Sequence, residues 1–300
     1  MNTPNTTTVS QPNVSAFDSN YADTRQLVNR IDDALANVDG QLEQIDQAEY
    51  PFELSVIVPV FNERQTLPKI LERIDEVMPE STQVIVIDDA STDGTSVWLA
   101  SLPQRSNRKI LRRICNHGKG SAVRLGIRHS QGRVVAIQDA DTEYDPKDLL
   151  QVIEPVLKGD EDVVYGSRYL GEIDDPSWVH RFGNWVLTAS SNCMTGQRLT
   201  DMETCHKAFR GDLVRSISIR ECRFGFEPEI TSKVAARGVR IAEVPTGYEY
   251  RSYEEGKKIT WKDGVAAFAC MWRYRNRGWF RRGFQGIGRL AKRTLVRKES

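Results

Sequence analysis

The 300-residue sequence lacks any apolar run long enough to cross a membrane. A membrane-spanning helix needs about 20 consecutive apolar residues, and no window of the chain approaches this length. The N-terminus also lacks the basic segment and apolar core of a signal peptide. We therefore expect a cytoplasmic protein that is not embedded in a bilayer.

Cysteine is scarce and shows no pattern of its own. The five cysteines are odd in number, and none forms a Cys-x-x-Cys pair or a Cys/His metal-binding spacing. This excludes a disulfide scaffold and a structural zinc site. We expect reduced thiols, as is usual in a cytoplasmic protein.

Net charge is absent overall, because 41 basic residues balance 41 acidic ones, but the charges are unevenly spread. Residues 1–50 hold eight acids against Arg25 and Arg30, whereas residues 273–300 hold ten basic residues against Glu299 alone. A basic end on a neutral protein indicates an anionic partner surface. We expect an anionic membrane and no nucleic acid.

The chain divides into four predicted segments. Residues 1–20 are rich in Asn, Thr and Ser and are expected to be a disordered tail. Residues 21–50 are expected to form an N-terminal helix with a short heptad seam, which either docks on its own domain or makes a homodimer. A catalytic domain is predicted from 51 to 262, and a C-terminal helix with a basic tail from 263 to 300.

Between residues 51 and 170, short β-branched apolar runs alternate with helix-like segments. This alternation predicts an α/β fold with a mainly parallel, Rossmann-like sheet and helices on both faces. The expected strands are 54–59, 83–87, 109–114, 133–138 and 162–165, and the expected helices are 63–77, 95–102, 120–129 and 145–157. Beyond residue 170, an acceptor-side subregion is expected from helices at 178–195 and 227–237, strands at 204–210 and 240–250, and a final helix at 261–274.

Pairs of carboxylates follow two of these strands. Asp88 and Asp89 end the second strand, and Asp139 and Asp141 follow the fourth. Because ligands of open α/β sheets bind beyond the carboxyl ends of the strands, all four acids are expected at one rim. A divalent cation carrying a nucleoside diphosphate suits such a rim, and Glu143 repeats the spacing as a third ligand. The alternative is a set of capping acids and a solvated acidic loop.

Two further loops carry candidate donor-binding groups. In Pro59-Val-Phe-Asn-Glu63, Pro59 is expected to end the strand, Phe61 to stack on a nucleobase and Glu63 to accept from it. In Asn116-His-Gly-Lys-Gly120, glycines at a helix start let backbone approach a phosphate, and Lys119 adds charge. Taken alone, a segment such as Pro59–Glu63 is usually just a turn, and a plain loop explains Asn116–Gly120 equally well. The first strand is not followed by Gly-x-Gly-x-x-Gly, which argues against a dinucleotide-dependent oxidoreductase.

The order and spacing of these motifs resemble family 2 glycosyltransferases of GT-A fold, and most closely the polyprenol-phosphate, dolichol-phosphate mannose synthase-like branch. The resemblance spans residues 54 to about 262. It is strengthened by Gly166-Ser-Arg-Tyr169, Asp201-Met-Glu-Thr-Cys-His-Lys-Ala-Phe-Arg210 and Phe224-Gly-Phe-Glu-Pro-Glu229. Members of this branch usually carry Tyr in place of Phe61, Gln in place of Glu143, and Thr/Ser-Gly-Phe-Arg where this chain has Thr204-Cys-His-Lys-Ala-Phe-Arg210.

The resemblance implies roles for individual residues. Asp139 and Asp141 would hold Mg²⁺ or Mn²⁺, to which the spacing of Glu143 adds a third candidate ligand. Arg168 and Arg181 would grip an acceptor phosphate. Asp139, Asp141, Arg168 and Asp201 form the expected catalytic set. The nucleotide-sugar would be bound by Pro59, Phe61, Glu63, Asp88, Asp89, Lys119, Arg251 and either Lys257 or Lys258.

The expected function is therefore an inverting, metal-dependent transfer of a sugar from a nucleoside-diphosphate donor, of GDP-mannose or UDP-glucose type, to a polyprenyl phosphate. The enzyme would act as a peripheral protein at the cytoplasmic face of the inner membrane. One alternative is a soluble or polysaccharide hydroxyl acceptor, which would need Asp201 or Glu203 as a base. Another is a noncatalytic sugar-nucleotide-binding protein.

Overall fold

The computed structural model describes residues 50–171, 178–223, 225–249 and 261–275. The predicted disordered tail, N-terminal helix and basic tail beyond residue 275 lie outside these ranges. So do Arg251, Lys257 and Lys258. The five cysteines all lie within them and are free thiols, in agreement with the sequence.

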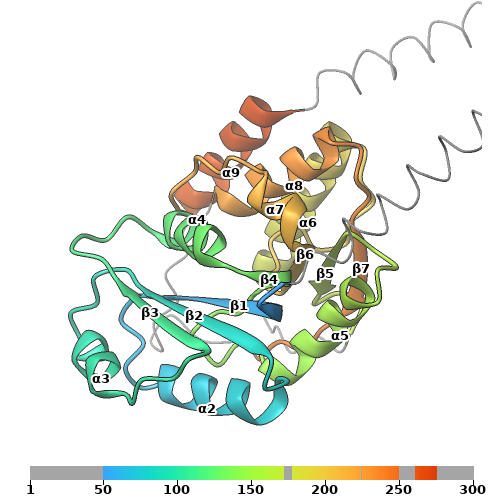
Figure 1. The fold of residues 1–300 in the computed structure, drawn as a ribbon. Helices are drawn as coiled ribbons and strands as arrows, with labels where there is room; N and C mark the ends of the chain where they lie inside the picture. The colour runs from blue at the N-terminus through green and yellow to red at the C-terminus, as the bar shows by residue number, and fades with distance from the viewer. Residues whose placement is uncertain (1–49, 172–177, 224, 250–260, 276–300) are drawn as a thin grey trace, which may run out of the picture. The chain divides into compact units, whose positions relative to one another are not determined.

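A seven-stranded sheet organises the described residues, with strand order β3-β2-β1-β4-β6-β5-β7 (Figure 1). The strands are β1 (Phe52–Val60), β2 (Thr82–Asp88), β3 (Arg108–Arg112), β4 (Gly132–Ile137), β5 (Val163–Ser167), β6 (Lys207–Arg210) and β7 (Ala242–Pro245). The helices are α2 (Leu67–Val77), α3 (Thr95–Ser101), α4 (Lys119–His129), α5 (Pro146–Leu157), α6 (Trp178–Thr195), α7 (Gly211–Arg215), α8 (Phe226–Ala236) and α9 (Trp261–Tyr274). The predicted α/β class and sheet with helices on both faces are confirmed.

Alternation along the strands builds a separate core on each face of the sheet. In β1, Leu54, Val56 and Val58 pack with residues of α2, α3 and α5, whereas Ile57 packs with residues of α4, α7, α8 and α9. Both sets are almost completely buried, so the central strand is apolar on both sides, as expected for a covered parallel strand. Figure 1 shows the two helix layers on opposite sides of the strands.

Local signals place the helix starts where the sequence predicts them. Asp145 caps α5 by accepting a hydrogen bond from the backbone N of Lys147 at 2.8 Å, and Pro146 occupies the first helical position. In α4, a Cβ on Gly126 would lie 2.4 Å from Cγ2 of Ile57. A glycine at this position therefore lets the helix approach β1 closely.

Strand β6 departs from the prediction. It was expected as part of an acceptor-side subregion, but it lies inside the sheet, antiparallel to both β4 and β5. Two smaller differences concern the predicted strand 240–250, of which only Ala242–Pro245 is a strand, and the unpredicted helix α7. β1 also continues through Pro59 to Val60 instead of stopping at the proline. Within the described ranges, no helix combines the length and apolarity that a membrane crossing requires.

Candidate active site

The described site residues that follow the strands gather at one edge of the sheet. Strands β1, β2, β4 and β5 end there, and the antiparallel β6 begins there. This edge collects the loop after β1, Asp88 and Asp89, the loop around Asp139 and Asp141, and the turn before β6 that carries Asp201. The strand ends thus form the expected rim. Because β6 runs antiparallel to its neighbours, the turn before it, which carries Asp201, lies at the same rim.

The loops after β1 and β2 are fastened to each other. The backbone N of Asn62 donates to Oγ of Ser91 at 2.9 Å, and Oδ1 of Asn62 accepts from the backbone N of Thr92 at 2.8 Å. Pro59 is buried in the strand, while Phe61 and Glu63 follow it and are partly exposed. A carboxylate oxygen of Glu63 accepts from the hydroxyl of Thr66 at 2.7 Å. The predicted roles of these residues in donor binding remain predictions.

Asp88 and Asp89 organise the loops around them. Asp88 is fully buried and accepts from the backbone N of Ser91 at 2.9 Å and from the hydroxyl of Ser96. Asp89 accepts from the backbone N of Gly118 at 2.6 Å and pairs with Arg113 at 3.1 Å. Their carboxylates therefore hold the chain beside the site, and their predicted contact with a nucleotide stays a prediction.

Gly118 is required where the loop enters α4. Its φ is +89°, and a Cβ there would lie 2.6 Å from the backbone oxygen of Cys222. The same oxygen accepts from the backbone N of Ser121 at 3.0 Å. The start of α4 is thereby docked on the segment that precedes α8.

Lys119 links two acids at the site. Its Nζ lies 3.0 Å from Oδ2 of Asp139 and 3.3 Å from Oε1 of Glu227, the second residue of α8. Burial alone would lower the pKa of Lys119, but Asp139, Cys205 and Glu227 outweigh it and raise that pKa well above its usual value. Burial likewise opposes ionisation of Asp139, yet Lys119 and the Cys205 thiol hold the pKa of Asp139 below its usual value. Both groups are therefore charged at neutral pH.

The predicted metal ligands have oxygen donors of the kind that Mg²⁺ and Mn²⁺ prefer. Within the described ranges, however, no three His, Cys, Asp or Glu side chains are gathered closely enough to hold a metal ion. One oxygen of Asp139 faces Lys119, and Oδ1 of Asp141 accepts from the backbone N of Glu143 at 3.2 Å. The donor chemistry thus fits a hard cation, and the arrangement of Asp139, Asp141 and Glu143 as its ligands remains a prediction.

A buried hydrogen-bond chain that the sequence did not predict supports the same loop. Nε2 of Gln138 donates to the carbonyl oxygens of Asp139 and Tyr144, at 3.2 and 3.0 Å. These oxygens can only accept, so Oε1 of Gln138 is the group that faces His206, and it accepts a hydrogen bond from Nε2 of that ring at 3.0 Å. Nδ1 of His206 then accepts from the hydroxyl of Thr246 at 2.9 Å. Burial lowers the pKa of His206 to about 3, which keeps the ring neutral.

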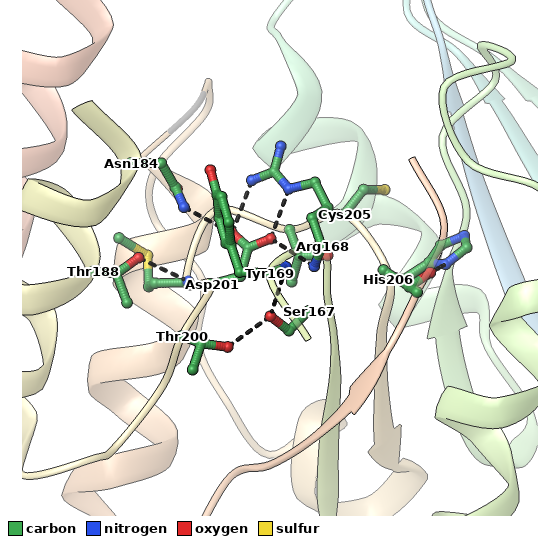
Figure 2. Close-up of polar contacts among 12 residues, drawn as sticks. Ser167, Arg168, Tyr169, Asn184, Thr188, Thr200, Asp201, Cys205 and His206 are labelled. Carbon is green, nitrogen blue, oxygen red and sulfur yellow. Dashed lines mark hydrogen bonds and ion pairs between the residues drawn. The ribbon is translucent and has the colours of Figure 1, made fainter. Parts of the chain in front are cut away.

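Arg168 and Asp201 form the central ion pair of the acceptor side (Figure 2). Nε and Nη2 of Arg168 donate to the two carboxylate oxygens of Asp201 at 2.6 and 2.8 Å. Asn184 of α6 donates to the same carboxylate at 3.2 Å, from the side opposite Arg168 in Figure 2. The guanidinium carbon also lies 5.1 Å from the ring centre of Tyr248. Arg168 is thus fixed in orientation, with Nη1 outside the pair.

This geometry argues against Asp201 as a base. Burial would raise the pKa of Asp201, but Arg168 outweighs it and holds that pKa below its usual value. A base that is buried, paired and weakly basic is poorly suited to accept a proton. Arg181, the other predicted acceptor ligand, is exposed on α6 one turn before Asn184. It therefore lies near the pair, and its role stays a prediction.

Comparison with known proteins identifies the class of this chain. Residues 55–217 match the model of glycosyl transferase family 2, and the chain belongs to this family. It is 32% identical over 210 residues to the undecaprenyl-phosphate mannosyltransferase of Micrococcus luteus, covering 67% of this chain and 85% of that protein. It is 27% identical to the dodecaprenyl-phosphate galacturonate synthase of Rhizobium johnstonii, covering 68% of this chain and 61% of that protein.

The fold agrees with this assignment. A crystal structure of glucosyl-3-phosphoglycerate synthase from Mycobacterium tuberculosis, in complex with Mn²⁺, UDP-glucose and phosphoglyceric acid, superposes with a TM-score of 0.56. The alignment covers 74% of this chain and 79% of that one at 18% sequence identity. The chain is therefore a glycosyltransferase with a GT-A fold.

Proposed function

We propose that this enzyme transfers a sugar from a nucleoside-diphosphate donor to a polyprenyl phosphate. The observation that carries the proposal is Arg168, which Asp201 fixes at the end of β5 with one amine outside the pair. A guanidinium in a fixed orientation is a preferred phosphate ligand in proteins. The named relatives from M. luteus and R. johnstonii support a polyprenyl phosphate as the acceptor.

The donor is proposed to lie on the other side of the edge, over the loops after β1, β2 and β4. Phe61 and Glu63 would contact the base, and Lys119 would stand near the diphosphate, together with Arg251 and Lys257 or Lys258. A donor of GDP-mannose or UDP-glucose type suits these groups. Asp139 and Asp141, with Glu143, would hold Mg²⁺ or Mn²⁺, which would supply positive charge to the leaving diphosphate.

The proposed reaction is a single inverting displacement. An acceptor phosphate oxygen attacks the anomeric carbon of the sugar, a new carbon–oxygen bond forms, and the bond to the nucleoside diphosphate breaks. A phosphate is already ionised near neutral pH, so it needs less help from a base than a hydroxyl does. The protein then contributes alignment and charge stabilisation, through Arg168 on the acceptor and cationic groups on the donor.

A peripheral location at the cytoplasmic side of the inner membrane is part of this proposal, and helix α6 supports contact with a membrane. Its polar residues Thr188 and Ser191 are buried, whereas Trp178, Phe182 and Trp185 are 74%, 59% and 63% exposed. These aromatics are spaced four and three residues apart, so they share one face of the helix. Aromatic side chains on a helix surface favour the boundary between lipid and water. Together with the basic tail beyond residue 275, this face would keep the enzyme beside a lipid-borne acceptor.

Transfer assays test the acceptor. The purified protein is given labelled GDP-mannose and UDP-glucose, with Mg²⁺ or Mn²⁺, and either a polyprenyl phosphate, the corresponding polyprenol, or soluble sugars. We expect labelled lipid only with the phosphate acceptor. Labelling of the polyprenol or of soluble sugars at an equal or higher rate would overturn the proposal in favour of a hydroxyl acceptor.

Liposome cosedimentation tests the location. Replacing Trp178, Phe182 and Trp185 by serine should weaken binding to anionic vesicles, and so should deletion of residues 279–300. Val97→Ser is the matched control, because Val97 is equally exposed but lies on α3. Binding that survives both changes at low salt would refute attachment through these two segments.

A further inference from the structure

We propose that Glu203 holds its carboxyl in the protonated form and donates a hydrogen bond to the acceptor phosphate beside Arg168. This inference rests on the proposed function and adds a second phosphate ligand to it. Glu203 lies in the turn before β6, two residues after Asp201. It directly precedes Thr204-Cys-His-Lys-Ala-Phe-Arg210, the segment in which this chain departs from the Thr/Ser-Gly-Phe-Arg pattern of the resembling branch.

The backbone on both sides of Glu203 is clamped. The Lys207 side chain is buried, and its Nζ donates hydrogen bonds to the carbonyl oxygen of Met202, at 3.1 Å, and to that of Thr204. The backbone N of Met202 donates in turn to the hydroxyl of Thr188 on α6, at 3.1 Å. The backbone of the turn is therefore held in place on both sides of Glu203.

The Glu203 side chain is left without a protein partner for one of its oxygens. Oε1 of Glu203 is buried and makes no hydrogen bond, and the same is true of Oε2 of Glu227. An unpaired buried carboxylate oxygen is costly, because it loses its water without replacement. Protonation of Glu203 removes the charge and so lowers that cost.

The charges around Glu203 favour the protonated form. Burial is the largest cause and the neighbouring carboxylate of Glu227 the second largest, and together they raise the pKa of Glu203 to about 8. Lys207 from β6 and Arg168 from the end of β5 oppose this shift, and Asp201 adds to it. Cys270 of α9 is also close enough for the charge of Glu203 to raise the pKa of its thiol, as the smallest of several contributions after burial. Glu227 forms its ion pair with Lys119 of α4 and not with Glu203.

A protonated Glu203 suits a phosphate better than a hydroxyl acceptor. An ionised carboxylate would repel the phosphate that Arg168 attracts, whereas a carboxylic acid donates to one of its oxygens. A hydroxyl acceptor would instead need Glu203 ionised, as a base. The two cases predict opposite effects of Glu203→Gln, because glutamine keeps a donor but cannot accept a proton from a hydroxyl.

The test is the pH dependence of binding of a soluble short-chain prenyl phosphate, measured by calorimetry from pH 7 to 9.5. The second ionisation of such a phosphate, with a pKa of about 6, is about nine-tenths complete at pH 7 and essentially complete above pH 8. Wild-type affinity should fall by up to tenfold per pH unit above about pH 8, as Glu203 ionises. Glu203→Gln should bind as tightly as wild type at pH 7 and lose this decline. Glu154→Gln, on the exposed face of α5, is the control and should behave as wild type.

Each outcome decides between the assignments. A decline that persists in Glu203→Gln, or no decline in the wild type, overturns the role of Glu203. A loss of sugar transfer of about a hundredfold or more in Glu203→Gln at pH 7 overturns it too, and makes Glu203 a base. If the prenyl phosphate binds with the expected pH dependence but no sugar is transferred to it, the proposed function fails while the phosphate site stands.

Discussion

Arg168 and Asp201 are joined by two parallel hydrogen bonds of 2.6 and 2.8 Å, although 33 residues separate them in the chain. Asp201 is fully buried, whereas the Arg168 side chain is 17% exposed. The acid therefore anchors the guanidinium, and the guanidinium reaches the surface of the site. The sequence predicts a separate role for each residue, whereas the structure joins them in one ion pair.

Breaking this pair should destabilise the fold. Asp201→Asn leaves the Arg168 charge without a partner, and removal of one member of a buried pair costs about 3–5 kcal/mol. Because Arg168 depresses the pKa of Asp201, the stabilisation is present above the ordinary aspartate pKa of about 3.9 and is lost as pH falls through the lowered value. Urea unfolding at pH 7 and pH 3 measures both effects.

Asp162→Asn is the matched control for this prediction. Asp162 pairs with Arg210, but the two side chains are 38% and 53% exposed. An exposed ion pair contributes about 0–1 kcal/mol. Equal costs for Asp201→Asn and Asp162→Asn would show that burial of the Arg168 pair has no energetic consequence.

Asp141→Asn should abolish transfer and leave the fold intact. If Asp141 helps to neutralise the leaving diphosphate through a metal ion, loss of its charge should lower the rate on the order of 10²–10³. Transfer of labelled sugar and the melting temperature are measured with and without Mn²⁺. Near-normal turnover by the folded variant in saturating Mn²⁺ or Mg²⁺ would exclude Asp141 as a metal ligand.

His206→Gln should destabilise the protein in a manner that depends on pH. Burial lowers the pKa of His206 to about 3, so the neutral ring stabilises the fold above its ordinary pKa of about 6.5. This contribution is lost as pH falls from 6.5 toward 3, because the unfolded chain binds the proton first. The cost of the substitution should therefore be about 1–3 kcal/mol at pH 7 and shrink by pH 4.

Denaturant unfolding at pH 7, 6, 5 and 4 checks this trend. His117→Gln serves as the comparison, because the side chain of His117 is exposed. A cost of His206→Gln that stays constant from pH 7 to 4 would contradict a neutral, buried imidazole.

Gly118→Ala should cost more than Gly159→Ala. Both glycines have positive φ, +89° and +79°, so each alanine bears a backbone penalty of about 1 kcal/mol. Only at Gly118 would the new Cβ also clash, at 2.6 Å from the Cys222 backbone oxygen, whereas nothing lies within 4 Å at Gly159. Melting temperatures of the two variants, with nucleotide-sugar titrations, would show whether displacement of the α4 start also weakens donor binding. Equal melting temperatures would refute the steric argument.

The strand ends and their acids could be predicted from the sequence because the signals are local. The apolar runs 84–87 of β2 and 134–137 of β4 are uninterrupted, and Asp88 and Asp139 follow them within two residues. The position of β6 could not be predicted in this way, because four residues carry no information about direction or about which strands they pair with.

The ion pairs could not be predicted from the sequence either. Nothing in the local pattern relates Asp201 to Arg168, or Lys119 to Glu227, since the fold alone brings them together. The raised pKa of Glu203 depends first on burial and then on Glu227, and neither acid is unusual in its own segment. Residue types therefore indicated which side chains matter, while burial determines which of them are charged.

The place of β6 between β4 and β5 also affects how the protein is made. A nascent chain that has emerged up to β5 lacks the strand that must lie between β4 and β5, because β6 is about 40 residues further on. Until residue 210 leaves the ribosome, β4 presents an unpaired apolar edge of the kind that aggregates or recruits chaperones. The same late segment brings Asp201, Glu203 and Lys207 to the site, so completion of the sheet and completion of the catalytic edge are one event in synthesis.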